Sequence, residues 1–589
     1  MLNGNSGEVL AMEYSRSKTN PKKRFDRLIL VSMAFFVLIG IISIRLFHLQ
    51  VISHRAYAQE AQCQRELTQT LLPHRGQIYW KDGSTGQAYT AATNKFFWQL
   101  YAVPQDIANP QRVAHDLAPI IGITEDVLLL KLDKPNDPYE PIQDRLTEPQ
   151  VSAVRALDFK GLGFREMEQR YYPEGPMGSA VLGFVSWLSD EHKGQYGIEQ
   201  QFEKNLAGNA GSLHVENDIA GRPIIVGERV VTEPVDGDDI MLTIDRTVEY
   251  IACNALRQAA VSHQASGGSV IIIDPHSGKI LALCGFPEFD ANTYKEVGDA
   301  SWYVNQTVNH EYEPGSTFKA ITAAIGLDFG EITPETTYED TGQVKFGPHT
   351  IQNALGQKEG KQTMTQVLEK SLNTGAVWMG FKIGQERYFE GLKKFGFGTK
   401  TGIALPGEVS GNISSLKKKG DIYLATATFG QGISVTPMQM AVAFASLVNG
   451  GVVYKPWIVE SIQKQDGTVQ IFEPEVVGHS IQPRASLLIS GMLGAVVKEG
   501  YSGQAQVPGY YVGGKSGTAQ VAGNDGRYSG DTIHSFIGFA PVDNPRFVIL
   551  AKLDKVKTSR FAQGSALPLF KEIAQFLLTY YGVPTVDNN

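Results

Sequence analysis

The sequence predicts an α+β protein with a single membrane-spanning helix near its N-terminus, a β-rich domain, and a larger domain with an antiparallel sheet flanked by helices. Three observations support this prediction. Residues 28–44 form an apolar stretch without charge, and residues 55 to about 235 contain short β-prone runs broken by turn residues. Beyond residue 240, apolar strand patterns stand at both ends of the chain with helical patterns between them.

Length and composition limit the possible classes of protein. A chain of 589 residues is too long to fold around one hydrophobic core, so we expect two to four domains. A hydrophobic fraction of 42% and a charged fraction of 19% are typical of globular proteins, and a net charge of −8 gives no basic surface for nucleic acid. Three scattered cysteines, Cys63, Cys253 and Cys284, exclude a disulfide scaffold and a thiolate zinc site.

The apolar stretch predicts a membrane anchor over residues 28–49. Its 17 uncharged residues span about 26 Å as a helix, enough for a thin hydrocarbon core. The preceding residues 1–27 hold six Lys or Arg residues against three acidic ones, a net +3. Because a basic flank stays on the cytoplasmic side, we expect a cytoplasmic tail over residues 1–27 and an extracytoplasmic chain after about residue 50.

Two other interpretations of this stretch are a buried core helix and a cleaved signal peptide. The one-sided basic flank argues against a core helix. Ala56-Tyr57-Ala58 has the form of a cleavage site, but it lies 12 residues beyond Ile44, and Arg45 interrupts the approach. We therefore expect an uncleaved single-pass anchor.

The two domains that follow can be outlined from local patterns. In residues 55–235 we expect strands and turns, such as Asp82-Gly83, interrupted by helices over residues 110–131 and 148–157. A polar turn at residues 234–239 marks the junction, and the second domain covers residues 240–582.

In the second domain, Asp245 caps a helix that runs to Ala260. Strand pairs are expected at 268–274 with 279–284 and at 534–540 with 547–552, and a final helix over 566–581.

Three short motifs carry the chemistry, and the first is Ser316-x-x-Lys319. A Pro-Gly pair precedes it and an apolar helix pattern follows, so Ser316 begins a helix and Lys319 lies on the same face. A lysine whose pKa is lowered by burial can take the serine proton and make the hydroxyl a nucleophile. Four other Ser-x-x-Lys sequences lack this setting.

The second motif is Ser371-Leu372-Asn373, expected in a loop after a helix. Ser371 could move a proton towards a leaving amine, and Asn373 could hold a substrate amide. The alternative interpretation is a cap at the end of a helix.

The third motif is Lys515-Ser516-Gly517-Thr518, expected on a strand. Lys515 supplies positive charge, Ser516 and Thr518 offer hydroxyls to a carboxylate, and Gly517 leaves room for a ligand backbone. A competing sequence, Lys400-Thr401-Gly402, has weaker strand flanks.

In this order the motifs resemble those of the class B penicillin-binding proteins, most of all the division-specific group. The resemblance extends over nearly the whole chain. This sequence differs from the usual motifs at two positions, where Leu372 replaces Asp and Ser516 replaces Thr. Further matching segments are Arg75-Gly76-Gln77-Ile78, Arg170-Tyr171-Tyr172-Pro173, Gly197-Ile198-Glu199, Leu405-Pro406-Gly407-Glu408 and Gly430-Gln431-Gly432.

The resemblance implies a pedestal or dimerisation domain followed by a transpeptidase domain with a helical subdomain. It implies a D,D-transpeptidase that cross-links peptidoglycan stem peptides at the septum, needs no cofactor or metal, and is inhibited by β-lactams. Ser316 would be the nucleophile and Lys319 its base. Ser371 and Lys515 would relay the proton, and Asn373 would orient the peptide.

The resemblance also implies that Ser516 and Thr518 bind the substrate carboxylate, while the backbone N–H groups of Ser316 and Thr518 hold the oxyanion. A glycan polymerase in the membrane and other division proteins are the expected partners, because no glycosyltransferase motif occurs before residue 240. Other functions remain open: a side-wall elongation transpeptidase, a D,D-carboxypeptidase or β-lactamase-type hydrolase, a non-enzymatic β-lactam sensor, and a structural scaffold.

Overall fold

The computed structural model describes residues 22–55, 57, 66–188, 191–216, 229–522 and 528–585. It divides into two compact units, one made of residues 1–72 and 210–234 and the other of residues 73–209 and 235–589. Most of the expected cytoplasmic tail, and Ala56 and Ala58 of the possible cleavage site, lie outside the described residues.

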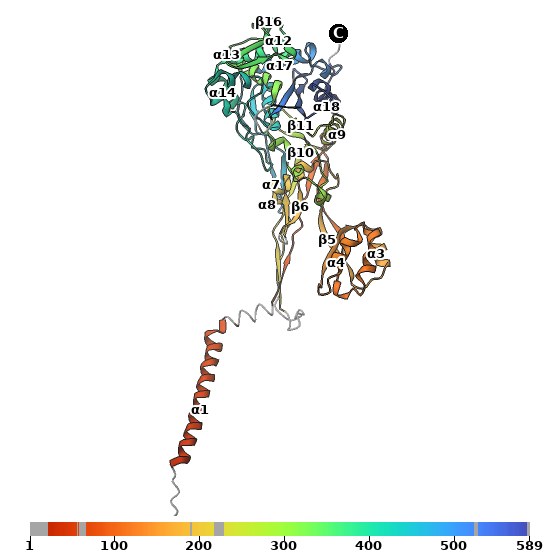
Figure 1. The fold of residues 1–589 in the computed structure, drawn as a ribbon, viewed down its shortest axis with the longest axis vertical. Coiled ribbons are helices and arrows are strands. Elements are labelled where there is room, and N and C mark those ends of the chain that lie inside the picture. The colour runs from red at the N-terminus through yellow and green to blue at the C-terminus, as the bar shows by residue number, and fades with distance from the viewer. Residues whose placement is uncertain are drawn as a thin grey trace, which may run out of the picture. The chain divides into compact units, whose positions relative to one another are not determined.

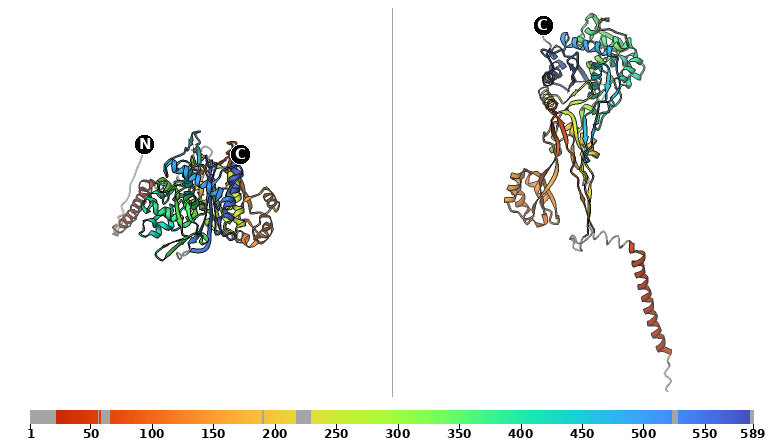
Figure 2. Two further views of the ribbon diagram at one scale, coloured as in Figure 1. Left: turned by 90° about the horizontal axis from the view of Figure 1, so that it is seen from above. Right: turned by 180° about the vertical axis from the view of Figure 1, so that it is seen from behind.

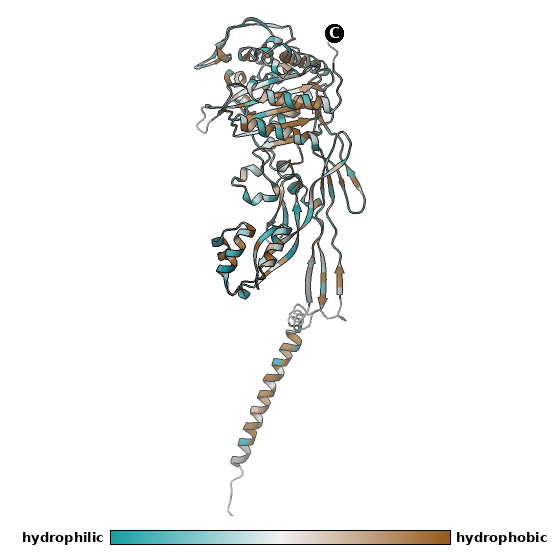
Figure 3. Ribbon diagram, turned by 90° about the vertical axis from the view of Figure 1, so that its right-hand side faces the viewer, coloured by the Kyte–Doolittle hydropathy of each residue, from teal (hydrophilic) through white to brown (hydrophobic). Residues whose placement is uncertain are grey.

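The first unit contains the apolar helix and a small sheet. Helix α1 (Lys22–Phe47) continues into a π-helical turn, η1 (His48–Ile52), and between Arg27 and Ile52 it is long and apolar enough to cross a membrane. Figure 3 shows apolar residues along most of its length. None of this span is buried in the protein, so it is not a core helix. Three antiparallel strands form the sheet, in the order β1 (Glu66–Leu71), β8 (Gly211–Glu216) and β9 (Arg229–Thr232).

The second unit contains two large sheets, and the first of them confirms the β-rich region. Its strands are β2 (Ile78–Lys81), β3 (Ala88–Ala102), β4 (Glu140–Leu146), β5 (Leu162–Tyr171), β10 (Asp239–Asp245), β18 (Val459–Gln463) and β19 (Val469–Ile471). The order is β19-β18-β10-β2-β3-β4, and β5 also pairs with β3. Strands β18 and β19 come from far along the chain, and the sequence did not predict their place in this sheet.

The expected helices form a lobe on strands β3, β4 and β5. The predicted helix over residues 110–131 is two helices, α3 (Pro110–Ile121) and α4 (Glu125–Leu132), because Gly122 adopts a φ of 73° and ends the first one. The second prediction is confirmed as α5 (Glu148–Ala156). Leu117, Leu128 and Val151 belong to a core of the lobe's own, and Figures 1 and 2 show the lobe at the end of β5.

Short elements connect this region to the rest of the unit. They are η2 (Pro104–Asp106), α6 (Ser179–Leu182), β6 (Phe184–Leu188), β7 (Glu191–Gln195), α7 (Gly197–Gln201) and α8 (Glu203–Leu206).

The second large sheet confirms both predicted strand pairs. Its antiparallel order is β12-β11-β23-β22-β21, so strands from the start and the end of the domain lie side by side. The bounds are β11 (Gly267–Ile273), β12 (Ile280–Phe286), β21 (Gly513–Ala522), β22 (Tyr528–Ala540) and β23 (Phe547–Asp554).

Alternate residues of this sheet face two different layers of helices. Ile272 and Ile549 pack with helices α9 (Arg246–Ser262) and α18 (Ala566–Tyr580), whereas Ile271 and Leu550 face the other core. Asp245 caps α9 by accepting from the N–H groups of Thr247 and Val248, as the sequence predicted.

The other layer is the helical subdomain that surrounds Ser316. Its helices are α10 (Gln306–Asn309), α11 (Phe318–Asp328), α12 (Met364–Glu369), α13 (Asn373–Ile383), α14 (Gln385–Lys394), α15 (Asp421–Ala427), α16 (Pro437–Val448) and α17 (Pro483–Glu499).

Two-stranded sheets and single turns complete the domain. The sheets are β13 (Thr337–Asp340) with β16 (Gly360–Thr363), β14 (Gln343–Phe346) with β15 (His349–Gln352), and β17 (Val452–Tyr454) with β20 (Val476–His479). The turns are η3 (Ala291–Glu296), η4 (Ala300–Tyr303), η5 (Gly315–Thr317), η6 (Ala354–Gly356), η7 (Ser414–Lys417), η8 (Gly503–Ala505) and η9 (Ala562–Gly564).

A disulfide joins Cys253 of α9 to Cys284 of β12, 31 residues apart in sequence. The cysteine spacing excluded a disulfide scaffold but gave no sign of this single bond. The helix packs on the strand and brings the two sulfurs together, which is a tertiary contact that spacing alone does not reveal.

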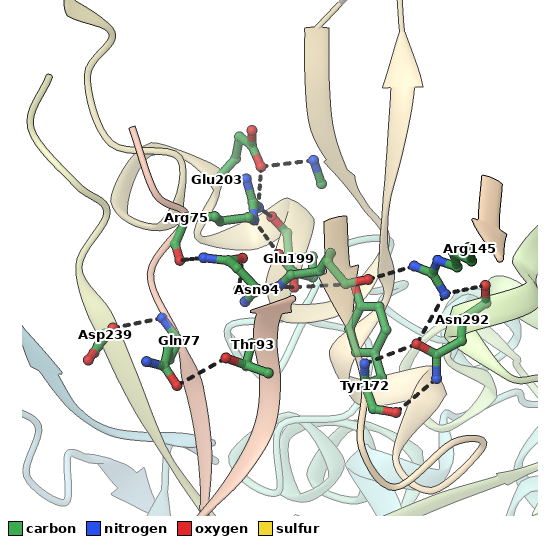
Figure 4. A network of polar contacts seen from close by, with 12 residues as sticks. Arg75, Gln77, Thr93, Asn94, Arg145, Tyr172, Glu199, Glu203, Asp239 and Asn292 are labelled. Carbon is green, nitrogen blue, oxygen red and sulfur yellow. Dashed lines mark hydrogen bonds and ion pairs between the residues drawn. The ribbon is translucent and has the colours of Figure 1, made fainter. Parts of the chain in front are cut away.

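A buried ion network holds the pedestal segments together. Glu199 is fully buried, and its two carboxylate oxygens each lie 2.7 Å from a guanidinium Nε, one of Arg75 and one of Arg170. Arg75 also reaches Glu203 at 2.6 Å. Arg75, Arg170 and Glu199 lie in three of the segments on which the family resemblance rested, and Figure 4 shows Arg75 beside Glu199 and Glu203.

Candidate active site

Ser316 lies at the start of a helix, in a turn held by two glycines. The turn η5 leads directly into α11, and Gly315 adopts a φ of 59°. The Gly315 N–H donates to the carbonyl oxygen of Gly430 over 3.1 Å. A Cβ atom on Gly430 would lie 2.4 Å from the Gly315 oxygen, so only glycine allows this approach. The Gly-Gln-Gly segment therefore positions the serine.

Lys319 is fully buried one turn further along the same helix. Its Nζ donates to the Ser371 carbonyl oxygen at 2.5 Å and lies 3.2 Å from Ser371 Oγ. In the part of the chain that the structure describes, no hydrogen bond joins Lys319 to Ser316. Burial, with the nearby charge of Lys515, lowers the pKa of the Lys319 amine well below its usual value. A lowered pKa favours the neutral form of this amine, which is the form that can accept a proton.

Ser371 contacts both lysines. It lies in the short connection between α12 and α13, with a φ of 54°, and its Oγ accepts from Lys515 Nζ at 3.1 Å as well as from Lys319. Asn373 lies at the first position of α13 and not in a loop, and its Nδ2 donates to the Gln352 carbonyl oxygen over 2.7 Å. The motif is therefore a junction between two helices.

Lys515 lies on β21, the edge strand of the five-stranded sheet, as the sequence predicted. Only 1% of its surface is exposed, and its Nζ donates to Ser371 Oγ and to the Ser516 carbonyl oxygen, each at 3.1 Å. Burial lowers the pKa of this amine to about 7. Near neutral pH, Lys515 can therefore both give and take a proton.

A cleft of about 690 Å³ brings most of the predicted site residues together. Ser316, Ser371, Asn373, Ser516 and Thr518 line it. The competing Lys-Thr-Gly sequence at residues 400–402 does not line this cleft.

The space beside Gly517, which we expected to be open for a ligand backbone, is occupied by other residues of the protein. A Cβ atom there would lie 2.7 Å from Ser535 Oγ and 3.0 Å from Thr317 Cγ2. The space that the glycine leaves is filled by the turn that carries Ser316. Because Gly517 has no side chain, this turn packs closely against the strand that carries Lys515.

Glu249, Cys253 and Cys284 are a group of potential metal ligands close enough to share one ion. Because the two sulfurs are bonded to each other, they are not thiolate ligands.

Comparison with known proteins identifies the family. Residues 70–242 match the penicillin-binding protein dimerisation domain, and residues 268–575 match the penicillin-binding protein transpeptidase domain. The chain belongs to the class B penicillin-binding proteins. This confirms the resemblance seen in the sequence and the predicted α+β architecture.

Individual relatives span nearly the full chain. Stage V sporulation protein D of Bacillus subtilis is 32% identical over 95% of this chain and 87% of its own. The peptidoglycan D,D-transpeptidase FtsI of Escherichia coli is 26% identical over 95% and 94%. The crystal structure of penicillin-binding protein 3 from Mycobacterium tuberculosis, complexed with ampicillin, is 25% identical and has a TM-score of 0.68, covering 88% of this chain and 98% of that one.

Several residues that line the cleft of this penicillin-binding protein were missed by the motif analysis. Tyr501 accepts a hydrogen bond from Gln357 over 3.0 Å, and the Arg560 guanidinium lies over the ring of Phe561. They come from separate loops and turns, so no spacing rule connects them. Gln431 also lines the cleft, and its place in the Gly-Gln-Gly segment was the one available signal.

Proposed function

We propose that this protein is a peptidoglycan D,D-transpeptidase that cross-links stem peptides through an acyl-enzyme on Ser316. The observation that supports this best is the placement of Ser371 Oγ within hydrogen-bond distance of two buried lysine amines, beside the cleft that Ser316 lines. This arrangement supplies a nucleophile, a base and a proton path without a metal or cofactor.

In the first half of the reaction, Ser316 Oγ attacks the carbonyl carbon between the two terminal D-Ala residues. Its proton passes to the amine of Lys319, because burial lowers the pKa of that amine and favours its neutral form. The tetrahedral intermediate then collapses, the C–N bond breaks, and a proton reaches the leaving D-Ala amine through Ser371 and Lys515. The short contacts of Ser371 with both lysines support this relay.

Binding of the negatively charged groups falls to the edge strand. The backbone N–H groups of Ser316 and Thr518 hold the oxyanion, and the hydroxyls of Ser516 and Thr518 bind the terminal carboxylate. Because β21 is an edge strand, its outer side has no neighbouring strand in the described sheet. Asn373 orients the peptide from the opposite wall. In the second half, the amine of a neighbouring stem peptide attacks the acyl carbon, releases Ser316 and completes the cross-link.

The cellular setting follows from the anchor and the relatives. We place the N-terminus in the cytoplasm and the pedestal (residues 55–235) and transpeptidase domain (residues 240–582) outside the membrane, because the basic residues precede the apolar stretch at residues 28–44. Action at the division septum, beside a glycan polymerase contacted through the anchor and pedestal, is supported by the sequence resemblance and by the FtsI relative.

Labelling with a fluorescent penicillin tests the enzyme function. We expect one covalent adduct, mapped by mass spectrometry to Ser316, and its loss in Ser316→Ala. The matched control is Ser414→Ala, because Ser414 begins another Ser-x-x-Lys sequence but is exposed outside the cleft. An unmodified wild-type protein, or an adduct elsewhere, would overturn the proposal. Rapid hydrolysis of the adduct would instead favour a β-lactamase-type enzyme.

A further inference from the structure

A second pocket, of about 580 Å³, lies away from the active-site cleft. We call it the junction pocket. Its walls come from strands β4, β5 and β6 of the pedestal and from the turn η3 of the transpeptidase domain. This volume is within the usual range for small-molecule sites. Its polar and charged lining residues include Lys131, Asp144, Arg145, Arg170, Ser186, Asn292, Thr293, Lys295 and Glu296.

The first unusual feature of the junction pocket is the charge of Arg145. Its guanidinium donates to Gln169 Oε1 at 2.8 Å and to the carbonyl oxygens of Asn292 and Arg170 at 2.8 and 2.6 Å. All these acceptors are neutral, and within the described ranges no carboxylate lies within ion-pair distance of Arg145. Figure 4 shows the side chain directed at Asn292. Desolvation lowers the pKa of the partly buried Arg145, while the charges of Asp290 and Asp144 oppose this shift without reversing it.

The backbone of Arg145 is also unusual. Its φ is 58°, a left-handed conformation that costs about 1–3 kcal/mol for a residue with a side chain. Such strain persists only where the surrounding structure imposes it. Here it directs a charged group into the wall of a pocket.

The second unusual feature is an unused hydrogen-bond donor on Arg170. This side chain is 5% exposed and lines the junction pocket. Its Nε and Nη1 bond to Glu199 and Asn94, but its Nη2 has no partner among the described residues. Native proteins rarely leave a buried charged donor unsatisfied.

Among the Lys and Arg residues that line the pocket, Arg145 is the one without an ion pair in the part of the chain that the structure describes. Arg170 pairs with Glu199 in the buried network. Lys131 and Lys295 pair with Glu140 and Asp144, each at 3.9 Å. The carboxylates of Asp144 and Asp290 act on Arg145 only from beyond ion-pair distance, so a bound anion would supply its first direct ion pair.

We propose that the junction pocket binds a small ligand through one carboxylate group. A carboxylate would give Arg145 the direct ion pair that it lacks, and a guanidinium is the best-matched partner of a carboxylate. Ser186, Thr293 and Asn292 offer uncharged hydrogen bonds to the rest of the ligand. Because the walls come from the pedestal and the transpeptidase domain, the bound ligand would stabilise the contact between them. The site is independent of the reaction at Ser316.

The test is a titration of the full-length protein in detergent with 4-fluorobenzoate, observed by fluorine NMR at constant ionic strength. We expect saturable binding at one site, with 4-fluorobenzamide binding at least about tenfold more weakly because it has no charge. Phenyl phosphate is the third probe, and tighter binding of that compound would overturn the assignment to a carboxylate.

Two variants test whether 4-fluorobenzoate binds in the junction pocket. Arg145→Gln removes the guanidinium that would pair with the ligand. Thr293→Glu puts a carboxylate into the pocket from an exposed position, so it serves if the first variant is poorly folded. Each should weaken binding at least about tenfold. Arg165→Gln is the matched control, because Arg165 is an exposed arginine on β5 outside the pocket. The proposal would be overturned if 4-fluorobenzoate binding did not saturate, or if a folded Thr293→Glu variant bound this compound as tightly as the wild type.

Discussion

Replacing Lys515 with Met should make the protein more stable at neutral pH while it removes activity. Burial lowers the pKa of the Lys515 amine from 10.5 in the unfolded chain to about 7 in the folded one. At about 1.4 kcal/mol for each pH unit, this difference corresponds to about 5 kcal/mol. Because the folded pKa is the lower one, the unfolded chain binds the proton more tightly. The folded state is therefore destabilised below about pH 7, and its stability rises between pH 7 and 10.5.

Methionine matches the length of lysine without its charge, so Lys515→Met removes this penalty. It also removes the hydrogen bonds to Ser371 Oγ and the Ser516 carbonyl oxygen, which together contribute about 2–3 kcal/mol. We expect a net stabilisation of about 2–3 kcal/mol at pH 7, which disappears or reverses near pH 10.5. Acylation by penicillin should fall by about 10²–10⁴-fold, because the proton relay is broken.

Calorimetry at pH 7 and pH 10, with wild type and variant in the same detergent, measures the stability difference. The matched control is Lys419→Met, since Lys419 is exposed and its replacement should have the same small effect at both pH values. If Lys515→Met lowers the melting temperature at pH 7, or shifts it equally at both pH values, burial does not control the charge of Lys515.

Three further changes test other parts of the structure. Ser371→Ala should slow penicillin acylation by about 10²–10⁴-fold in stopped-flow measurements and lower the free energy of unfolding by about 1–3 kcal/mol, because the hydrogen bonds of its hydroxyl to Lys319 and Lys515 are lost; a rate within threefold of wild type would exclude a proton relay through this hydroxyl. Glu199→Gln should lower the free energy of unfolding by about 3–5 kcal/mol, because two guanidinium groups lose their buried partner, whereas Glu166→Gln on the exposed part of β5 should have little effect. Joint replacement of Cys253 and Cys284 by Ser should cost about 3–4 kcal/mol from the 31-residue separation, and a reducing agent should destabilise only the wild type.

Local patterns explain why much of the fold could be predicted. Both strand pairs of the five-stranded sheet consist of apolar runs around a turn, and turn residues act over a few positions. The helix that begins after Asp245 has its cap residue in the adjacent position, and the last helix, α18, carries a continuous apolar face. In each case the information lies within about 20 residues.

Long-range contacts explain what could not be predicted. Strand β18 pairs with β10 although more than 200 residues separate them, and the sequence of neither strand indicates which strand it pairs with. The bond between Lys319 and Ser371 has the same origin, because spacing on one helix suggested Ser316 as the partner of Lys319. The loops that carry Tyr501 and Arg560 meet in the cleft only after the two layers have packed.

The two groups of buried charges in this molecule follow opposite rules. In the pedestal, Arg75 and Arg170 share the carboxylate of Glu199, so loss of Glu199 leaves Arg170 without an ion pair among the described residues and Arg75 with Glu203 alone. The shared carboxylate joins three of the segments on which the family resemblance rested, and Arg75 and Glu199 lie 124 residues apart. In the active site, Lys319 and Lys515 are equally buried, yet no carboxylate pairs with either among the described residues. A carboxylate there would restore the ordinary pKa of each amine and stabilise the fold, but it would also keep Lys319 protonated and unable to accept a proton from Ser316. The missing partner is therefore a condition of the chemistry, and the stability that it costs is the quantity that Lys515→Met should recover.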